Sequence, residues 1–279
     1  MSAIYDLHTH STASDGAYTP AELVRQAASA GVTHLALTDH DSTEGTAEAQ
    51  VAARDCGNIQ LIPGVEISVS WQDKSVHIVG LNIDPGCITL QQGLAGLQAI
   101  RLIRAEEIGR RLARYGVEGA FEAARALAGT GMITRTHFAR YLVQSGLAPG
   151  IKEVFDRYLS HGKPGYVQTH WATLADAVHW ISQAGGVAVL AHPQRYKLTG
   201  SWMRRLLGEF KETGGAALEV ISGTANPNDI QAAVDHARRF GLLASVGSDF
   251  HSPEHNWLKL GRLPPLPQGV TPVWRLWDG

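Results

Sequence analysis

The sequence contains few cysteines, no excess charge of either sign and no long apolar run. Its two cysteines, Cys56 and Cys87, are too few and too far apart for a disulfide framework or a thiolate zinc site. Lys and Arg number 24 and Asp and Glu number 26, so no basic field favours a long nucleic acid or a membrane as the partner. Because no signal segment and no bilayer-spanning stretch are present, we expect a cytoplasmic protein.

Short apolar segments alternate with amphipathic segments along most of the chain. We expect strands at 4–7, 33–38, 60–69, 76–81, 187–191, 216–221 and 242–246. Helices are expected at 20–30, 44–53, 174–183, 202–212 and 229–240, the first with Thr19 as N-cap and Pro20 in its first turn. About seven strand–helix units of this kind are typical of an α/β fold with a mostly parallel sheet or barrel.

The middle and the end of the chain depart from this alternation. From 90 to 159 the periodicity is almost only helical, so we expect a helical insertion, or lid, at 90–165 within a barrel formed by 1–89 and 166–279. The closing segment 263–277 contains three prolines. It is either a polyproline ligand or a tail that packs Trp274 and Trp277 against the barrel, and we favour the tail.

Histidines and carboxylates gather where the predicted strands end, which is where parallel α/β folds carry their sites. His8 and His10 alternate along a strand, so both imidazoles point the same way and two ligands converge on one ion. Burying many ionisable groups together is costly unless cations compensate them, so the whole set predicts a metal centre. Its members are His8, His10, Asp15, His40, Glu66, His77, His192, Asp249 and His251.

A single histidine at a strand end is more often a hydrogen-bonded structural residue than a metal ligand. Asp39 and Asp41 flank His40 and either orient it or cap the following turn. We assign structural or surface roles to the other histidines, His34, His161, His179, His236 and His255.

These motifs occur in the order found in the PHP (polymerase and histidinol phosphatase) domain, which the chain resembles over most of its length. The matching segments are 8–11, 14–16, 37–41, 63–66, 191–193 and 247–251, together with His77. The resemblance implies a distorted (β/α)7 barrel with a cluster of three divalent ions that hydrolyses phosphate esters by attack of a bridging hydroxide.

The resemblance also implies how the ions are shared. One ion would be held by His8, His10, Glu66 and Asp249, a second by Asp15, His40 and His251, and a third by Glu66, His77 and His192. Mixed imidazole and carboxylate ligands suit manganese, iron and zinc alike, so the ligand set does not predict which of these three elements is bound.

Family members that stand alone and carry an insertion of this length act on 3′,5′-nucleoside bisphosphates and trim the 5′ ends of short RNAs. Segment 132–140 resembles the part that they present to the substrate. We therefore expect release of a 3′-phosphate to give a nucleoside 5′-monophosphate, with a small phosphorylated nucleotide or short RNA end as the partner. Arg135 and His137 are the candidates for gripping phosphate, unless they are an ordinary pair on a helix surface.

Other possibilities remain open at this stage. Arg140, Lys163, His170 and Lys197 are further candidates for substrate contacts, and each is otherwise a solvated surface residue. A histidinol phosphate phosphatase of the same fold would carry the same metal site. A metal-binding interaction module without turnover is the alternative from another class. The oligomeric state is not predicted.

Overall fold

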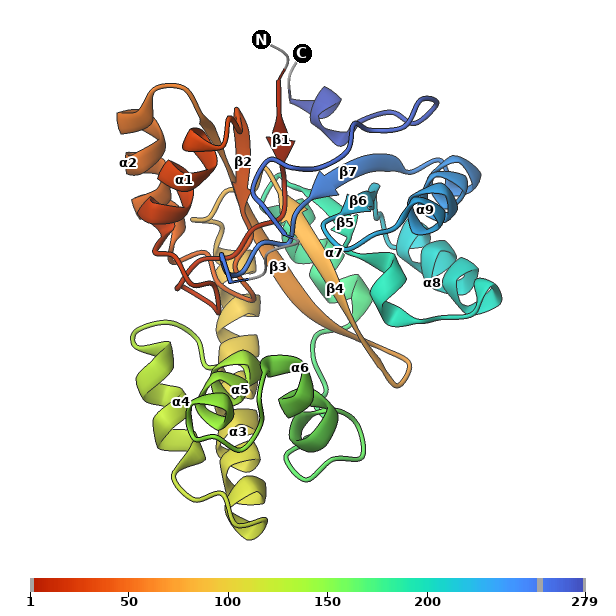
Figure 1. Ribbon diagram of the computed structural model, residues 1–279. Helices are drawn as coiled ribbons and strands as arrows, with labels where there is room; N and C mark the ends of the chain where they lie inside the picture. The colour runs from red at the N-terminus through yellow and green to blue at the C-terminus, as the bar shows by residue number, and fades with distance from the viewer. Residues whose placement is uncertain (1–2, 255–257, 278–279) are drawn as a thin grey trace.

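Seven strands pair in chain order to form one barrel (Figure 1). The computed structural model describes residues 3–254 and 258–277. The backbone N–H of Leu7 donates to Val246 O at 3.0 Å, which joins the first strand to the last and closes the barrel. The strands are β1 (Tyr5–Asp6), β2 (His34–Leu37), β3 (Gln60–Trp71), β4 (Lys74–Leu81), β5 (Val187–Leu190), β6 (Ala217–Ser222) and β7 (Leu243–Gly247).

Helices cover the outside of the barrel, and the expected α/β barrel is confirmed. They are α1 (Pro20–Ser29), α2 (Thr46–Cys56), α7 (Leu174–Gln183), α8 (Gly200–Glu212) and α9 (Pro227–Phe240). The capping prediction for α1 holds, because Thr19 Oγ1 accepts from Glu22 N at 3.2 Å and Glu22 accepts from Thr19 N at 2.9 Å. Within the described ranges, no helix is long and apolar enough to cross a membrane.

The expectation of seven strand–helix units is wrong at one place. β3 and β4 form an antiparallel hairpin, in which Trp71 pairs with Lys74, so only two residues separate the strands and no helix fits between them. β4 also pairs antiparallel with β5, whereas the other neighbouring strands run parallel. This one reversed strand is the distortion of the barrel.

The C-terminal tail packs against the opposite end of the barrel from the insertion (Figure 1). The ring of Trp274 stacks on Tyr5 of β1 with centroids 4.1 Å apart, and Ala244 N of β7 donates to Thr271 O at 2.8 Å. Trp277 and Trp274 pack against one apolar cluster of the barrel, which includes Leu7. The tail therefore covers the apolar interior at the end of the barrel where β1 begins.

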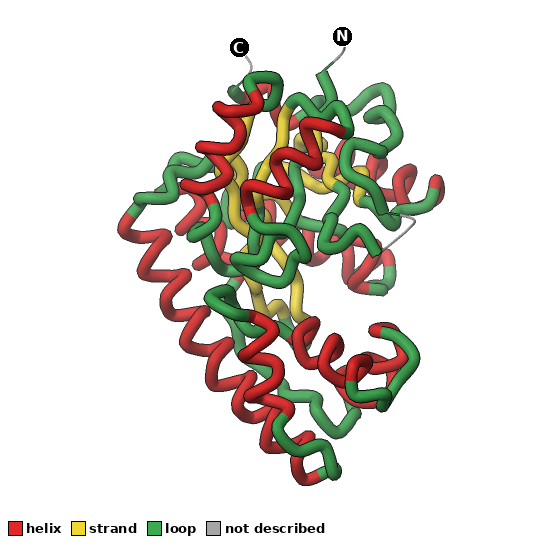
Figure 2. The backbone as a smooth tube through the Cα atoms, turned by 60° about the vertical axis from the view of Figure 1, so that its left-hand side comes forward, coloured by secondary structure: helices red, strands yellow, loops and turns green. Residues whose placement is uncertain are grey.

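Between β4 and α7 the chain forms a helical insertion below the barrel (Figures 1 and 2). Its elements are α3 (Ile88–Arg114), α4 (Ala120–Ala128), α5 (Arg135–Gln144), α6 (Ile151–Val154) and a π-helical turn (Phe155–Leu159). The 27-residue α3 is shared by two cores. Leu90 and Leu94 pack into the barrel core, whereas Ile108 and Leu112 pack with Phe138 in the insertion core.

Arg101 lies midway along α3 and joins the helix to the barrel. Its Nε donates to Asp41 Oδ2 at 2.6 Å and its Nη2 donates to Ser68 Oγ at 2.8 Å. Asp41 Oδ1 accepts from Ser68 N at 2.7 Å, so the aspartate holds both α3 and β3. Removing one member of such a buried pair leaves an uncompensated charge, so this contact is a strong link between α3 and the barrel.

We predict that Phe138→Ala loosens the insertion before the barrel. Phe138 is fully buried in the insertion core, and its truncation is expected to destabilise that core by about 3–5 kcal/mol. Amide hydrogen exchange should accelerate over 120–159 while β5 and β6 keep their protection. The exposed Leu127→Ala on α4 is the control, and equal loss of protection in the strands would contradict a separate insertion core.

Candidate metal centre and substrate pocket

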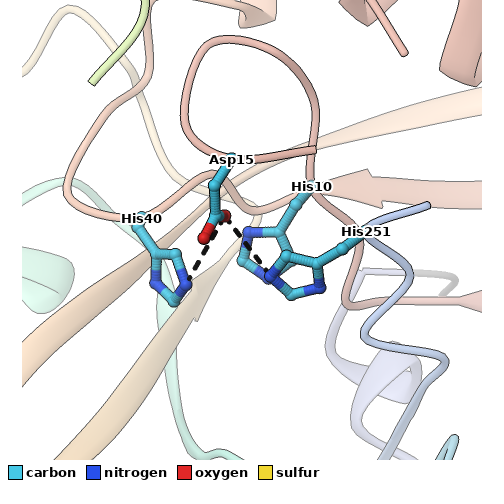
Figure 3. Close-up of side chains that lie close together, drawn as sticks. All are labelled: His10, Asp15, His40 and His251. Carbon is cyan, nitrogen blue, oxygen red and sulfur yellow. Dashed lines mark ion pairs between the residues drawn. The ribbon is translucent and has the colours of Figure 1, made fainter. Parts of the chain in front are cut away.

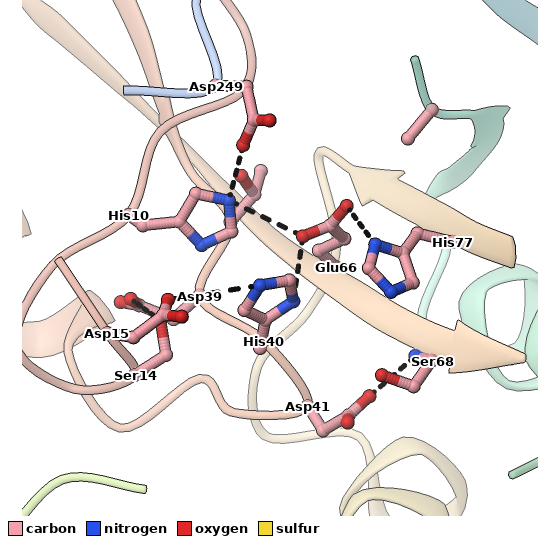
Figure 4. Close-up of polar contacts among 12 residues, drawn as sticks. His10, Ser14, Asp15, Asp39, His40, Asp41, Glu66, Ser68, His77 and Asp249 are labelled. Atoms are coloured by element: carbon pink, nitrogen blue, oxygen red, sulfur yellow. Dashed lines mark hydrogen bonds and ion pairs between the residues drawn. The ribbon is translucent and has the colours of Figure 1, made fainter. Parts of the chain in front are cut away.

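The predicted ligands meet at one end of the barrel (Figure 4). Parallel strands bring their carboxyl ends together there, so His8, His40 and Asp249, which follow β1, β2 and β7, become neighbours. β4 runs in the opposite direction, so it is the first half of β4 that lies near this end of the barrel. His77 lies in that half and pairs with Ser68 of β3. The barrel therefore gathers residues that are spread over most of the chain.

Glu66 is fully buried at the centre of this group. Burial raises the pKa of its carboxyl, but the surrounding histidines, led by His77, lower that pKa by more than burial raises it. The pKa of Glu66 therefore lies well below its usual range. Its oxygens face ring nitrogens of five histidines, namely His40 Nδ1 at 2.8 Å, His77 Nδ1 at 2.8 Å, His192 Nε2 at 3.0 Å, His8 Nε2 at 3.3 Å and His10 Nε2 at 3.4 Å.

Two more carboxylates, from Asp15 and Asp249, complete the group. Asp249 Oδ1 lies 3.1 Å from His10 Nε2. Asp15 Oδ1 lies 3.3 Å from His251 Nε2 and 3.8 Å from His40 Nε2. Figure 3 shows the side chain of Asp15 between the rings of His40 and His251, with His10 beside them. Each of the three carboxylates thus lies close to at least two of the six imidazoles.

Several buried polar atoms of this cluster lack a hydrogen-bond partner among the described residues. Leaving such an atom unpaired costs roughly 1–3 kcal/mol, whereas imidazole nitrogens and carboxylate oxygens are the ligands that divalent ions take. Burial lowers the pKa of His10 to about 3, so its ring is neutral and keeps a free lone pair. The cluster therefore fits divalent cations. The atoms concerned include His8 Nε2, both ring nitrogens of His10, Asp15 Oδ1, Glu66 Oε2 and His192 Nδ1.

Ligand atoms close enough to share an ion form overlapping groups. The groups are His10, Asp15, His40 and His251; His8, His10 and Glu66; His8, His192 and Asp249; and His40, Glu66 and His77. His10 joins the Asp15 group and His192 joins Asp249, which differs from the sharing that the sequence resemblance implies. Because members are shared, the nine residues form one continuous cluster rather than separate sites.

Two other buried carboxylates hold the ligands in place. Asp39 accepts hydrogen bonds from Ser11 N at 2.8 Å and from Ser14 Oγ at 2.6 Å, and so fixes the loop that carries Asp15 rather than orienting His40. Glu219 of β6 accepts from His192 N at 2.6 Å and lies 3.3 Å from His8 Nδ1. The sequence prediction missed Glu219, although a lone acidic residue within an apolar strand was a usable signal.

A pocket of about 360 Å³ lies over the cluster, between the barrel and the insertion. Arg101, Arg104 and Arg135 line its wall. The guanidinium groups of Arg101 and Arg104 stack over Trp171 at 5.1 and 5.2 Å, and that of Arg135 lies 5.4 Å from the ring of Phe155. Burial lowers the pKa of Arg104, and its Nε makes no hydrogen bond with the described residues. This wall can receive an anion.

The two candidates for gripping phosphate are placed differently. Arg135 lines the pocket. His137 is buried outside the pocket lining, and its Nδ1 accepts a hydrogen bond from Thr134 N at 3.0 Å. This bond closes the first turn of α5. The geometry therefore gives His137 a role in shaping the turn, and Arg135 alone remains in position to contact a substrate.

The four further candidates for substrate contacts also differ in whether they line the pocket. His170 lines the pocket, whereas Lys163 and Lys197 do not. Arg140 is not part of the pocket lining, and its Nη2 donates to the backbone oxygen of Asp15 at 3.0 Å. Its side chain thus supports the loop of a predicted ligand.

Among the described residues, the histidines that were assigned other roles, His34, His161, His179 and His236, lie outside the metal groups. His34 stacks on Tyr5 with centroids 4.3 Å apart, and His161 lies against Tyr166 at 5.0 Å. His179 and His236 lie on the outer helices α7 and α9, and His255 is outside the described residues.

The sequence prediction also missed Arg195, which forms an ion pair with Asp249 and lines the pocket. It lies in a 3-10 turn, Pro193–Tyr196, directly after His192. Tyr196 holds this turn, because its hydroxyl donates to Ala191 O at 2.9 Å and accepts from His77 N at 2.9 Å. The run of polar residues that follows β5 was the available signal.

A nearly closed α/β barrel that gathers nine histidine and carboxylate side chains able to hold metal ions, beneath a pocket lined by arginines, is typical of metal-dependent hydrolases. The PHP domain profile matches residues 6–167, and the chain belongs to the PHP domain family. The family prediction is thereby confirmed.

Similar proteins cover nearly the whole chain. The 3′,5′-nucleoside bisphosphate phosphatase of Chromobacterium violaceum is 48% identical over 97% of this chain and 95% of its own length. The 5′-3′ exoribonuclease Rnm of Escherichia coli is 46% identical over 99% of this chain and 94% of its own length. A solved structure from C. violaceum, described as an amidohydrolase with bound sulfate and no metal, has a TM-score of 0.94 and 46% identity, covering 99% of this chain and 96% of that one.

We predict that Glu219→Gln weakens metal binding about 10–100-fold, because the carboxylate that orients His8 loses its charge. Competition with a graded chelator, followed by elemental analysis, measures the change. Glu212→Gln, on the exposed end of α8, is the matched control and should bind metal as the unmodified protein does. Equal retention in both variants would show that Glu219 has no part in holding the ligands.

Proposed function

We propose that this protein removes the 3′-phosphate from 3′,5′-nucleoside bisphosphates, giving nucleoside 5′-monophosphates, and also trims the 5′ ends of short RNAs. The observation that carries the proposal is a pocket whose lining combines the candidate metal-ligand cluster with a group of arginines. The metal-ligand cluster forms its floor, and Arg101, Arg104 and Arg135 form its wall. A substrate with two phosphates can occupy both places at once. The names of the C. violaceum and E. coli relatives support it.

The nine clustered residues would hold the metal, which we propose to be manganese or iron, with zinc as a further possibility. When bound, divalent ions neutralise phosphate oxygens and make a water molecule acidic enough to attack at neutral pH. In the reaction, the water oxygen bonds to phosphorus, the bond from phosphorus to the 3′ oxygen breaks, and that oxygen leaves with a proton. Inorganic phosphate and a nucleoside 5′-monophosphate with a free 3′-hydroxyl result.

The pocket wall would bind the phosphate that is not hydrolysed. A guanidinium matches two phosphate oxygens at once, and Arg104 has a buried Nε without a partner among the described residues. Burial lowers the pKa of Arg135 as well, and the neighbouring guanidinium of Arg101 lowers it further. An anion placed among these groups relieves their mutual repulsion, so the 5′-phosphate is attracted to this wall.

The same arrangement explains activity on short RNA. In a 5′-phosphorylated strand, the terminal phosphate would occupy the arginine wall and the next phosphate would lie over the cluster. Hydrolysis there releases one nucleoside 5′-monophosphate and leaves a new 5′-phosphate on the shortened strand. The near balance of 24 basic and 26 acidic residues favours short strands over long ones. We place this activity in the cytoplasm, where such substrates arise.

Histidinol phosphate fits less well. It carries a single phosphate and a cationic amine, and the amine would face three guanidinium groups on the pocket wall. A metal-binding module without turnover is also disfavoured. All nine predicted metal ligands are present in the sequence, and all of them belong to the overlapping groups at the end of the barrel.

The central prediction is metal-dependent release of phosphate from adenosine 3′,5′-bisphosphate by protein loaded with Mn²⁺ or Fe²⁺. A chelator should abolish the activity, and His8→Ala should lower it by at least about 1000-fold because a ligand in two of the metal groups is lost. His179→Ala on the exposed face of α7 is the control and should leave the rate unchanged. Faster hydrolysis of histidinol phosphate than of the bisphosphate would contradict the proposal.

A second prediction separates the two phosphate positions. Arg104→Ala should raise KM for adenosine 3′,5′-bisphosphate about 10–100-fold, because a charge-assisted contact to the 5′-phosphate is lost. Adenosine 3′-monophosphate lacks that phosphate, so its KM should change little. Steady-state phosphate release with both substrates tests this. A similar rise in KM for both would show that Arg104 does not bind the 5′-phosphate.

A further inference from the structure

The first turn of α5 contacts both the pocket and the metal cluster. The hydroxyls of Thr134 and Thr136 donate to the same atom, Asp15 Oδ2, at 3.1 and 2.8 Å. Arg135 lies between them in the sequence and lines the pocket. Three consecutive residues of the insertion therefore join a phosphate-binding candidate to a metal-ligand candidate that is about 120 residues away in the chain.

The loop that carries Asp15 is held from two sides. On the barrel side, Asp39 accepts from Ser14 Oγ at 2.6 Å. On the insertion side, Arg140 Nη2 donates to the backbone oxygen of Asp15 at 3.0 Å, and Met132 N donates to Ala13 O at 3.3 Å. The insertion is thus a structural part of this ligand loop.

The backbones on the insertion side are in close contact. A Cβ at Gly131 would lie 2.1 Å from the backbone oxygen of Thr12, so no larger residue fits between the insertion and the ligand loop. Gly131 lies just before α5, so this backbone contact and the threonine hydroxyls together couple the start of α5 to the loop of Asp15.

The two hydroxyl contacts also orient the carboxylate. Because both go to Oδ2, the other oxygen, Oδ1, faces His251 at 3.3 Å and His40 at 3.8 Å. Oδ1 is buried and makes no hydrogen bond with the described residues. This is the arrangement in which one carboxylate oxygen is fixed by protein donors and the other is left for an ion.

We propose that Thr134 and Thr136 are positioning residues for the ion held by Asp15, and that substrate phosphate on Arg135 strengthens the binding of that ion through them. The inference rests on the proposed function, since it assigns a phosphate to Arg135. Substrate binding restrains the turn, and the restrained turn holds Asp15 in its ligating orientation. Because coupling between two sites is reciprocal, the ion must strengthen phosphate binding by the same factor.

The first experiment measures metal retention by the Mn²⁺-loaded protein against a graded chelator. Thr136→Val, which removes the hydroxyl but keeps the size, should release its most weakly held Mn²⁺ at about 10–100-fold lower chelator concentration. Thr136→Ser restores the hydroxyl and should retain metal nearly as the unmodified protein does. Thr130→Val, at an exposed position in the turn that precedes α5, is the matched control and should behave like the unmodified protein.

The second experiment repeats the titration with adenosine 5′-monophosphate, the expected product, or with inorganic phosphate. In the unmodified protein, adenosine 5′-monophosphate should shift release of the weakest Mn²⁺ to about 5–10-fold higher chelator concentration, a typical coupling factor. Arg135→Ala and Thr136→Val should each abolish that shift. Inorganic phosphate lacks the nucleoside and should shift release less.

Two results would overturn the inference. One is metal retention by Thr136→Val equal to that of the unmodified protein, and the other is the same nucleotide-induced shift in Arg135→Ala as in the unmodified protein. Thermal unfolding of each variant shows whether the fold is intact, and recovery in Thr136→Ser distinguishes positioning from misfolding. If adenosine 3′,5′-bisphosphate is not hydrolysed although the metal shifts occur as expected, the proposed function fails and the coupling stands.

Discussion

The buried carboxylate of Glu66 is the constraint on which the rest of the site depends. Five histidines, from three different strand ends and one strand interior, face its two oxygens within 3.4 Å. A charge in this position is tolerable only if cations or protonated partners surround it. The closed barrel places those partners around Glu66, because β3 lies beside β2 and β4 and directs the side chain into the common mouth.

The insertion gives this mouth its substrate pocket. α3 belongs to the barrel core at its start and to the insertion core at its end, and Arg101 ties its middle to Asp41. The same stretch of α3 presents Arg104 to the pocket, opposite the first turn of α5. One long helix therefore fixes where this arginine lies relative to the candidate metal-ligand cluster.

Prediction from the sequence succeeded where the determinants are local. His8 and His10 flank Thr9, which forms a parallel bridge with Phe250 just after β1, and this local alternation directs both rings to the same side. The cap at Thr19 and the helical character of the insertion are local in the same sense. The reversed strand β4 was not predicted as such, because an alternating pattern does not show in which direction a strand runs.

The sequence by itself determined which residues make up the candidate cluster and their order along the chain, since each belongs to a short motif beside a strand. Only the tertiary structure decided which of them become neighbours, and it brought in Glu219, Arg195 and Arg104, whose partners are distant in sequence. It also showed that His137 accepts a hydrogen bond in the first turn of α5, and it joined Thr136 to Asp15. These contacts depend on how α3 and β4 pack, which no local pattern encodes.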